Sequence, residues 1–453
     1  MVGVAGIRGI VGKDLTPEAV ARYAAAFGIW AKAGKVVLGR DSRTSGPMFV
    51  RAAAAGLMSV GCDVIDLGLV STPTAQLAVE YHRAAGGMVI TASHNPIEWN
   101  ALKFVGPDGI FLDQNGGARV VALAADGRLE RVGFGTLGDV APDSGATERH
   151  LAAVLRLKAV DVRGIRRRRF KVALDTVRGA GGAIMPELLK RLGCRVAGLN
   201  LDPDGRFPRP PEPLPEHLKA LGKVVRRSKA DVGFAVDPDV DRLAIVDERG
   251  RPIGEDYTLA FAVRAVLGKG RGGRGKTVVC NLSTSLVVDD AARECGASVV
   301  RAAVGEAHVA RAMLEARAPV GGEGNGGVIL PALHAGRDGP VAAALALTLL
   351  AREQRTVSEL VAAAPRYVIV KAKVERGTRS AEHSLTSVYA ALKRRFPDAT
   401  TDERDGLRLA WPDRWLHVRP SNTEPIIRLI AEAPTGAAAE GLIEEGRKLC
   451  AGS

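Results

Sequence analysis

The 453-residue sequence has the proportions of an ordinary folded protein, with 46% hydrophobic and 25% charged residues. At roughly 100–200 residues per domain, this length predicts two to four domains. Aromatic residues make up only 4%, so stacking surfaces for single-stranded nucleic acid should be scarce. No apolar run reaches the ~18 residues of a membrane helix, and the first residues lack the plan of a signal peptide. We therefore expect a cytoplasmic protein without membrane contact.

The net charge of +13 has two interpretations. It fits a polyanion such as nucleic acid, or a small phosphorylated substrate. The cysteines are scattered and form no C-x-x-C pair, which predicts neither a disulfide framework nor a zinc site and fits a reducing cytoplasm. They are Cys62, Cys194, Cys280, Cys295 and Cys450.

A weak internal repeat is the most informative feature of the chain. Each of three units opens with a basic residue and a short apolar strand, continues through a helical stretch to a glycine, and begins a second strand. Strands that alternate with helices predict parallel sheets with right-handed crossovers. The pairs of strands are 35–39 with 61–67, 171–175 with 193–199, and 276–280 with 296–302.

The third strand of each unit ends in a polar loop. Because ligands bind beyond the carboxyl ends of strands in open α/β sheets, these loops should form three walls of one site. The three segments are 88–96, 232–242 and 320–327.

The last part of the chain differs from the three repeats. From about Tyr367 it reads as a strand, a helix and several β-rich runs, which predicts an α+β domain with an antiparallel sheet. The predicted fold class is α/β, with three similar mixed or parallel α/β domains followed by a C-terminal α+β domain. The predicted domains are 1–145, 146–248, 249–364 and 365–453.

Ser93 lies in the first polar loop, between Thr91 and Pro96. A serine hydroxyl is a weak nucleophile without a base or an activated partner. As a phosphoserine it would store phosphate, and His94 and Lys103 could supply positive charge. The same serine could equally be a turn residue.

Three aspartates, Asp237, Asp239 and Asp241, alternate along the second loop. On an extended segment alternate side chains point to one side, so the carboxylates would converge on a hard cation. Three carboxylates leave coordination positions for phosphate oxygens, which suits magnesium. The alternative is an exposed acidic turn.

The third loop and a loop in the tail suit a sugar phosphate. Glu323 and Asn325 can bind vicinal hydroxyls, although a glycine-rich run can also be a simple turn. Arg419 and Arg428, with hydroxyl and amide groups between them, match a phosphate dianion. The alternative there is an Asn/Ser/Pro turn.

Together these motifs resemble the α-D-phosphohexomutase superfamily along the whole chain. T-A-S-H-N-P at 91–96, D-P-D-x-D-R at 237–242 and R-P-S-N-T-E-P at 419–425 occur in the family's order, and shorter matches include 39–43 and 336–339. The resemblance implies four domains around a central cleft in a heart shape. It also implies a magnesium-dependent isomerase of carbohydrate metabolism, with the phosphoserine, metal, sugar and phosphate loops in successive domains.

The resemblance further implies that Ser93 is the phosphorylated serine. Phospho-Ser93 would give its phosphate to a sugar hydroxyl, and the resulting bisphosphate, which also serves as activator, would return its other phosphate. Arg8, Lys103 and Arg242 would lie at the transferring phosphate. One Mg²⁺ per active site would be held by phospho-Ser93, Asp237, Asp239 and Asp241. The substrate would be bound by Glu323, Asn325, Arg419, Ser421, Asn422, Thr423 and Arg428.

The sugar loop departs from the G-E-x-S-G-H pattern of many relatives, since Asn325 replaces the serine and Gly327 the histidine. This leaves the general base open. The form G-G-E-x-N-G-G is similar to a phosphoglucosamine-mutase-like branch, which implies interconversion of glucosamine 6-phosphate and glucosamine 1-phosphate. A phosphomannomutase/phosphoglucomutase is the alternative. Glu306 and His308 are candidates for a contact with carbon 2, although both could also belong to a solvated helix start.

We expect a phosphorylated hexose or hexosamine as the partner, no nucleic acid and no membrane, and a monomer or homodimer. A phosphate- or nucleic-acid-binding module without turnover is the competing class. The aspartate loop argues against this class, because carboxylates repel a nucleic-acid backbone. A phosphatase is a third possibility, if water reached Ser93.

Overall fold

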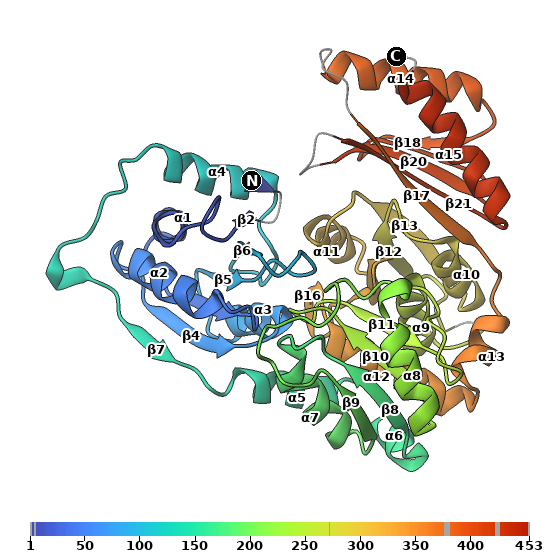
Figure 1. Ribbon diagram of the computed structural model, residues 1–453, viewed down its shortest axis with the longest axis horizontal. Helices are drawn as coiled ribbons and strands as arrows, with labels where there is room; N and C mark the ends of the chain where they lie inside the picture. Colours follow the sequence, from blue (N-terminus) through green and yellow to red (C-terminus); the bar gives the residue numbers. More distant parts are fainter. Residues whose placement is uncertain (1, 4–5, 271, 376–380, 422–425, 452–453) are drawn as a thin grey trace.

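The computed structural model describes residues 2–3, 6–270, 272–375, 381–421 and 426–451. They form four sheets that follow one another along the chain, each accompanied by helices (Figure 1). Each predicted domain range contains one of these sheets, while the boundaries themselves stay a prediction. Within the described ranges, no helix combines the length and the apolar character needed to cross a membrane.

The first sheet is mixed, in the order β1-β2-β6-β5-β3-β4-β7. Strands β3, β4 and β5 are parallel, whereas β6 is antiparallel to both β5 and β2. The strands are β1 (Val2–Gly3), β2 (Gly6–Ile10), β3 (Val36–Arg40), β4 (Val64–Leu69), β5 (Gly86–Ile90), β6 (Trp99–Val105) and β7 (Val140–Pro142). The helices are α1 (Pro17–Trp30), α2 (Gly46–Met58), α3 (Thr72–Tyr81) and α4 (Gln114–Ala125).

The second sheet has the order β11-β10-β8-β9, with β8, β9 and β10 parallel and β11 antiparallel to β10. Its strands are β8 (Lys171–Asp175), β9 (Arg195–Leu199), β10 (Val232–Val236) and β11 (Leu243–Val246). Its helices are α5 (Ala146–Arg156), α6 (Val162–Arg168), α7 (Gly181–Arg191) and α8 (Lys219–Ser228).

The third sheet, β13-β12-β14-β15-β16, repeats the same parallel core. In all three sheets the first strand of the repeat lies between the second and the third, as in β4-β3-β5, β9-β8-β10 and β13-β12-β14, so the predicted repeat is confirmed. The strands are β12 (Thr277–Asn281), β13 (Ser298–Ala302), β14 (Val320–Glu323), β15 (Gly327–Leu330) and β16 (His334–Arg337). The helices are α9 (Asp256–Leu267), α10 (Leu286–Glu294), α11 (Glu306–Glu315), α12 (Gly339–Glu353) and α13 (Val357–Ala362).

The fourth sheet is antiparallel throughout, in the order β17-β21-β20-β19-β18, which confirms the predicted α+β tail. Its strands are β17 (Val368–Glu375), β18 (Thr400–Asp402), β19 (Leu407–Ala410), β20 (Trp415–Pro420) and β21 (Ile426–Ala433), and its helices are α14 (Ala381–Arg395) and α15 (Gly436–Ala451).

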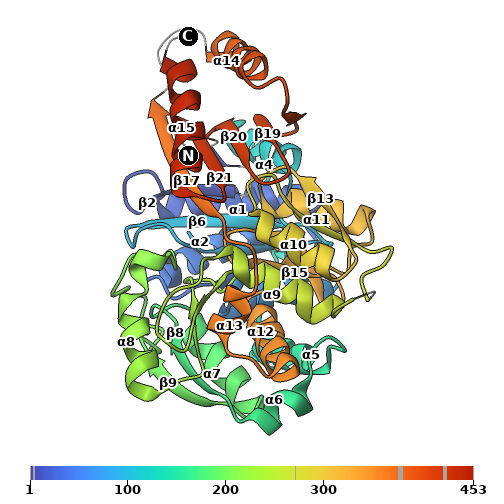
Figure 2. The ribbon, with the colours of Figure 1, turned by 90° about the vertical axis from the view of Figure 1, so that its right-hand side faces the viewer.

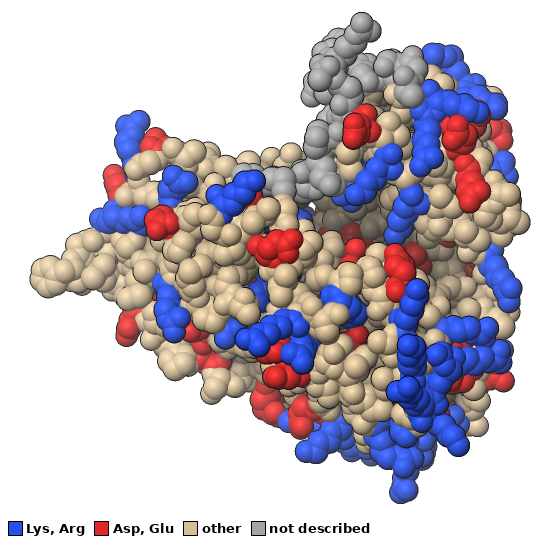
Figure 3. Space-filling model, in the orientation of Figure 1, with Lys and Arg blue, Asp and Glu red and all other residues tan. Residues whose placement is uncertain are grey.

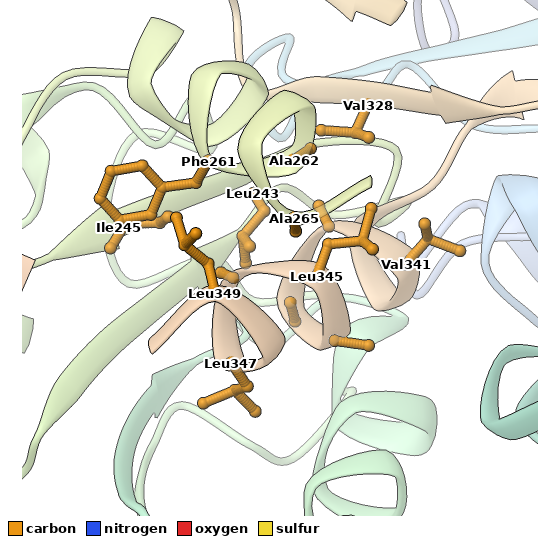
Figure 4. Packing of buried hydrophobic residues seen from close by; sticks show 14 of the residues in the cluster. Leu243, Ile245, Phe261, Ala262, Ala265, Val328, Val341, Leu345, Leu347 and Leu349 are labelled. Atoms are coloured by element: carbon orange, nitrogen blue, oxygen red, sulfur yellow. The ribbon is translucent and has the colours of Figure 1, made fainter. Parts of the chain in front are cut away.

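Helix α12 joins the second and third units into one core. Every residue from Gly339 to Leu350 is buried, as expected for a helix that is apolar on all sides. Its leucines pack against α9 and β11, where Leu349 lies close to Phe261 and Leu345 lies close to Ala265 (Figure 4). This shared core includes residues of both β10 and β14, the strands that precede two of the polar loops.

The fourth unit lies at one end of the molecule and the second at the opposite end, in both views of the ribbon (Figures 1 and 2). Glu432 on β21 accepts hydrogen bonds from the Ser285 hydroxyl and, at 2.8 Å, from the Leu286 backbone N–H at the start of α10. The fourth unit is thereby attached to the third. Figure 3 shows the surface hollowed just below the fourth unit.

Candidate active site

The three polar loops that follow β5, β10 and β14 meet, as predicted. Ser93 Oγ donates to Asp237 Oδ2 at 2.7 Å, although the two residues are 144 positions apart. Asp241 and Glu323 both accept from Arg337, at 2.5 and 2.8 Å. Side chains from three sheets therefore form one continuous polar cluster.

The serine loop is held in a strained conformation by Arg43. Ser93 has φ +47°, a left-handed conformation that costs a non-glycine residue about 1–3 kcal/mol. The Arg43 guanidinium donates to three backbone carbonyls of this loop and to that of Trp99 at the start of β6, at 2.6–2.8 Å. Thr91 Oγ1 also accepts from the Ser93 N–H at 2.9 Å. These bonds fix the Ser93 hydroxyl toward the aspartates, and the side chain is only 5% exposed.

The three aspartates are fully buried, so the alternative of an exposed acidic turn is wrong. Their ligand oxygens lie within 4.8 Å of one another. Burial, followed by the charges of Asp241 and Asp239, raises the pKa of Asp237 well above its usual range. Burial also acts to raise the pKa of Asp239, but the charge of Lys103 and the hydrogen bonds from Asp237, Lys103 and Thr72 together hold that pKa below its usual value. The crowded carboxylates oppose one another's ionisation, and a bound cation would offset this repulsion.

The orientation of the free oxygens fits a divalent cation. Asp239 Oδ2 accepts from Lys103 Nζ and Thr72 Oγ1, both at 2.7 Å. Among the residues that the structure describes, Asp239 Oδ1 and Asp241 Oδ1 are buried and accept no hydrogen bond. Buried carboxylate oxygens without donors are costly unless a cation binds them, and a hard cation such as Mg²⁺ prefers oxygen ligands.

Cations lie near the serine loop, where the charges of Arg242, Lys103 and Arg8 act on His94, the neighbour of Ser93. Arg242 donates its backbone N–H to Asp237 Oδ1 at 3.3 Å and its guanidinium to Glu212 at 2.9 Å. Arg8 donates to Asn95 Oδ1 at 3.4 Å. Burial, then the charges of Arg428 and Arg242, lower the pKa of Arg8. Such a concentration of positive charge near the serine loop is suited to a phosphoryl group.

The surroundings of His94 do not favour the positive charge that it could supply. Its Nδ1 lies 3.4 Å from Ser93 Oγ. The charge of Arg242, with burial and Lys103 next in size, holds the pKa of His94 well below its usual value, which favours the neutral imidazole. Lys103 is charged as predicted, because Asp239 and Asp241 outweigh burial and raise its pKa.

The sugar loop places Glu323 at the end of β14, where it is 3% exposed. Its Oε1 accepts from Asn281 Nδ2 at 2.8 Å and from the Gly305 N–H at 2.9 Å. Asn325 is half-buried beside it, with Nδ2 3.5 Å from Glu323 Oε2. Burial acts to raise the pKa of Glu323, but Arg337 and Asn281 lower it below the usual value. A fixed carboxylate beside an amide can bind neighbouring sugar hydroxyls.

The tail loop brings Arg419 and Arg428 together as direct partners on β20 and β21. Like charges opposite each other on neighbouring strands repel, and an anion between them would relieve this repulsion. The Ser421 N–H donates to the Ile426 carbonyl at 2.9 Å, which closes the loop. The predicted residues Asn422 and Thr423 lie outside the described residues.

Sequence analysis missed two arginines of the site, Arg43 and Arg337. Both lie inside the short motifs 39–43 and 336–339, which were the only available signals. Glu306 is not in a solvated helix start, because it is 6% exposed and its oxygens accept from Gln76 and Arg337. It therefore faces protein donors, and His308 is half-buried.

Comparisons with known proteins agree along the whole chain. Four family models match in succession, described as phosphoglucomutase/phosphomannomutase alpha/beta/alpha domains I, II and III (residues 1–130, 148–250 and 254–367) and the C-terminal domain (370–449).

Three similar proteins illustrate the family. A phosphoglucomutase/phosphomannomutase of Thermococcus kodakarensis is 40% identical over 99% of this chain and 98% of that protein. A protein of Methanopyrus kandleri named probable phosphoglucosamine mutase is 39% identical over 98% of this chain and 96% of its own. The X-ray structure of a phosphoglucomutase/phosphomannomutase family protein from Burkholderia thailandensis superposes with a TM-score of 0.86 at 28% identity, covering 99% of this chain and 96% of that one.

Proposed function

Since the chain belongs to the α-D-phosphohexomutase superfamily and is therefore a mutase of the isomerase class, we propose that it interconverts glucosamine 6-phosphate and glucosamine 1-phosphate. The reaction would proceed through phospho-Ser93 and a sugar bisphosphate. The observation that carries this proposal is the 2.7 Å contact of the Ser93 hydroxyl with Asp237, inside a buried cluster of three carboxylates. A hydroxyl so placed can carry a phosphate whose oxygens share a cation with the aspartates.

Magnesium is the cation that suits this site. Asp237, Asp239, Asp241 and the phosphate on Ser93 would hold one ion per active site. When bound, Mg²⁺ neutralises charge on the phosphoryl oxygens, which is the main electrostatic demand of phosphoryl transfer. Lys103, at 2.7 Å from Asp239 and 3.6 Å from Asp241, partly offsets the three negative charges and holds both carboxylates in place.

The other residues of the cluster orient and neutralise the substrate. Arg242 and Arg8 would bind the oxygens of the transferring phosphate from two sides. Arg419 and Arg428, with Ser421, would bind the phosphate that does not react, and the predicted Asn422 and Thr423 would complete this clamp. Glu323 and Asn325 would bind sugar hydroxyls and so select which hydroxyl faces phospho-Ser93.

The choice of glucosamine phosphate rests on the sugar loop, which contains Asn325 and Gly327, and on relatives named probable phosphoglucosamine mutase. The second candidate, a phosphoglucomutase/phosphomannomutase, is favoured by the Thermococcus kodakarensis relative at 40% identity. Glu323 and Asn325 do not separate the candidates, because glucose, glucosamine and mannose share the configuration of their 3- and 4-hydroxyls. Discrimination must come from the group that meets carbon 2.

Side-by-side specificity constants test the proposal. Glucosamine, glucose and mannose phosphates are assayed with magnesium and a bisphosphate activator, and glucosamine phosphate should give the highest kcat/KM. A preference of about tenfold for another sugar, equivalent to about 1.4 kcal/mol, would reject the glucosamine assignment and leave the phosphoserine mechanism standing. Location in the cytoplasm and a monomeric or homodimeric state stay predictions.

A further inference from the structure

One buried guanidinium joins the proposed metal loop to the proposed sugar loop. Arg337, at the end of β16, is 8% exposed. It donates to Asp241 Oδ2 at 2.5 Å, to Glu323 Oε2 at 2.8 Å and to Glu306 Oε2 at 3.0 Å. Glu306 in turn accepts from Gln76 on α3 at 2.9 Å. Side chains from the first three sheets or their helices thus converge around Arg337.

The sugar loop is shaped to admit this arginine. A Cβ atom at Gly327 would lie 2.2 Å from Cδ and 3.0 Å from Cγ of Arg337. Gly327 has no positive φ, so its lack of a side chain is required by space and not by backbone conformation. The space that a side chain at position 327 would need is therefore occupied by the Arg337 stem.

The contacts of Arg337 leave Asp241 with one oxygen that accepts no hydrogen bond from the described residues, whereas both oxygens of Glu323 accept hydrogen bonds. Asp241 Oδ2 is bound by Arg337, while Asp241 Oδ1 is buried and accepts no hydrogen bond from the described residues. Glu323 Oε1 is bound by Asn281 and Gly305, and Arg337 binds Oε2. Asp241 and Glu323 are therefore linked through one planar group, which gives a change in the orientation of Asp241 a path to Glu323.

We infer that Arg337 is a positioning residue that couples the binding of the divalent cation to the binding of the sugar. A cation on Asp241 Oδ1 would fix this carboxylate, and through the Arg337 fork it would fix Glu323 in the orientation that sugar hydroxyls need. The inference rests on the proposed function for the identity of both ligands. Lysine would keep the charge but could not form the planar, multidentate contacts.

Binding measurements without turnover test this coupling. In a Ser93→Ala parent, which cannot transfer phosphate to the enzyme, the Kd of Mg²⁺ is measured by calorimetry with and without saturating glucosamine 6-phosphate. The sugar phosphate should tighten Mg²⁺ binding by about fivefold or more, within the usual range of coupling between sites. Arg337→Lys should reduce the ratio of the two Mg²⁺ dissociation constants, without and with the sugar phosphate, to below about twofold.

A matched control and a double variant separate positioning from mere folding. Arg264→Lys alters another well-buried arginine, 10% exposed and paired with Glu294 at 2.7 Å, and should keep the parent's ratio. Gly327→Ala should lower the ratio, whereas adding it to Arg337→Ala should change the ratio little, because the colliding stem is gone. Thermal unfolding checks that each variant is folded.

Either of two results would overturn the inference: equal Mg²⁺ affinities with and without sugar phosphate in the parent, or an undiminished ratio in Arg337→Lys. Mutase turnover of the wild-type protein is assayed separately. If the proposed function is wrong, the wild-type protein will show no turnover in that assay. The coupling is tested separately, by the ratios of Mg²⁺ affinity.

Discussion

Replacement of Arg419 by alanine tests the proposed phosphate clamp most directly. Arg419 lies opposite Arg428 on the neighbouring strand, so the substitution removes a repulsive pair from the free protein. Arg419 Nε also donates to Asp405 Oδ1 at 3.1 Å, but Asp405 keeps a second donor, the Val304 N–H at 3.0 Å from its Oδ2. The folded protein should therefore tolerate the change.

The expected effect follows from the loss of one guanidinium from the anion site. A hydrogen bond to a charged group contributes about 1.5–3 kcal/mol, and about 1.4 kcal/mol corresponds to a factor of ten in affinity. Arg419→Ala should thus raise the KM for the sugar phosphate roughly 10- to 150-fold. The kcat should change little, because the clamp holds the phosphate that does not react and binds ground and transition states alike. Arg419→Lys should give an intermediate KM.

Initial rates over a range of sugar-phosphate concentrations, at fixed magnesium and bisphosphate, measure these constants. Arg414→Ala is the control, since Arg414 is a partly exposed cation of the same unit that pairs with Asp413 at 3.2 Å. Its KM should equal that of the wild type. If folded Arg419→Ala kept a KM within about twofold of the wild type, a difference of only about 0.4 kcal/mol, the clamp would be wrongly assigned.

Three further predictions concern the centre of the site and its surroundings. Intact-mass measurement of active protein should show a fraction heavier by one phosphate, which Ser93→Ala removes together with mutase activity; full activity in that variant would reject the phosphoserine. Chelation should abolish turnover and Mg²⁺ restore it, and Asp239→Asn should lose most activity and some stability, since Lys103 loses its 2.7 Å partner; undiminished rates in excess chelator would remove the metal from the mechanism. Burial raises the pKa of Asp256 to about 7. The folded protein therefore favours the protonated carboxyl, and this contribution to stability is complete below the unfolded pKa and is lost as pH rises through 7. Asp256→Asn should therefore raise the free energy of unfolding at pH 8 by up to about 4 kcal/mol and have little effect near pH 4; parallel pH profiles for the two proteins would contradict this.

Residue types and their order along the chain determined the fold class and most of the candidate site. Strand, helix and glycine recur in order, so the three parallel cores could be predicted from periodicity. Ser93, Asp237 and Glu323 could be located because each follows or ends a predicted strand, where ligands of α/β proteins bind. These inferences depend only on the spacing of residues along the chain, which folding does not change.

Other features were decided by contacts between distant parts of the chain. Val240 has φ +64° although it is β-branched, a conformation that sequence reasoning assigns to glycine, and it is held there fully buried in the shared core of the second and third units. The burial of the three aspartates exists only in the folded structure, and the low pKa of His94 depends on cations that other parts of the chain supply.

Arg337 illustrates why some features of the site follow from the sequence and others only from the tertiary structure. Its partners Asp241 and Glu323 lie 96 and 14 positions away in the chain, and only the meeting of β16 with the loops after β10 and β14 brings them within hydrogen-bonding distance. The type of a residue determines which bonds it can form. The free energy of those bonds depends on burial and on the charges nearby, and the tertiary structure alone sets both.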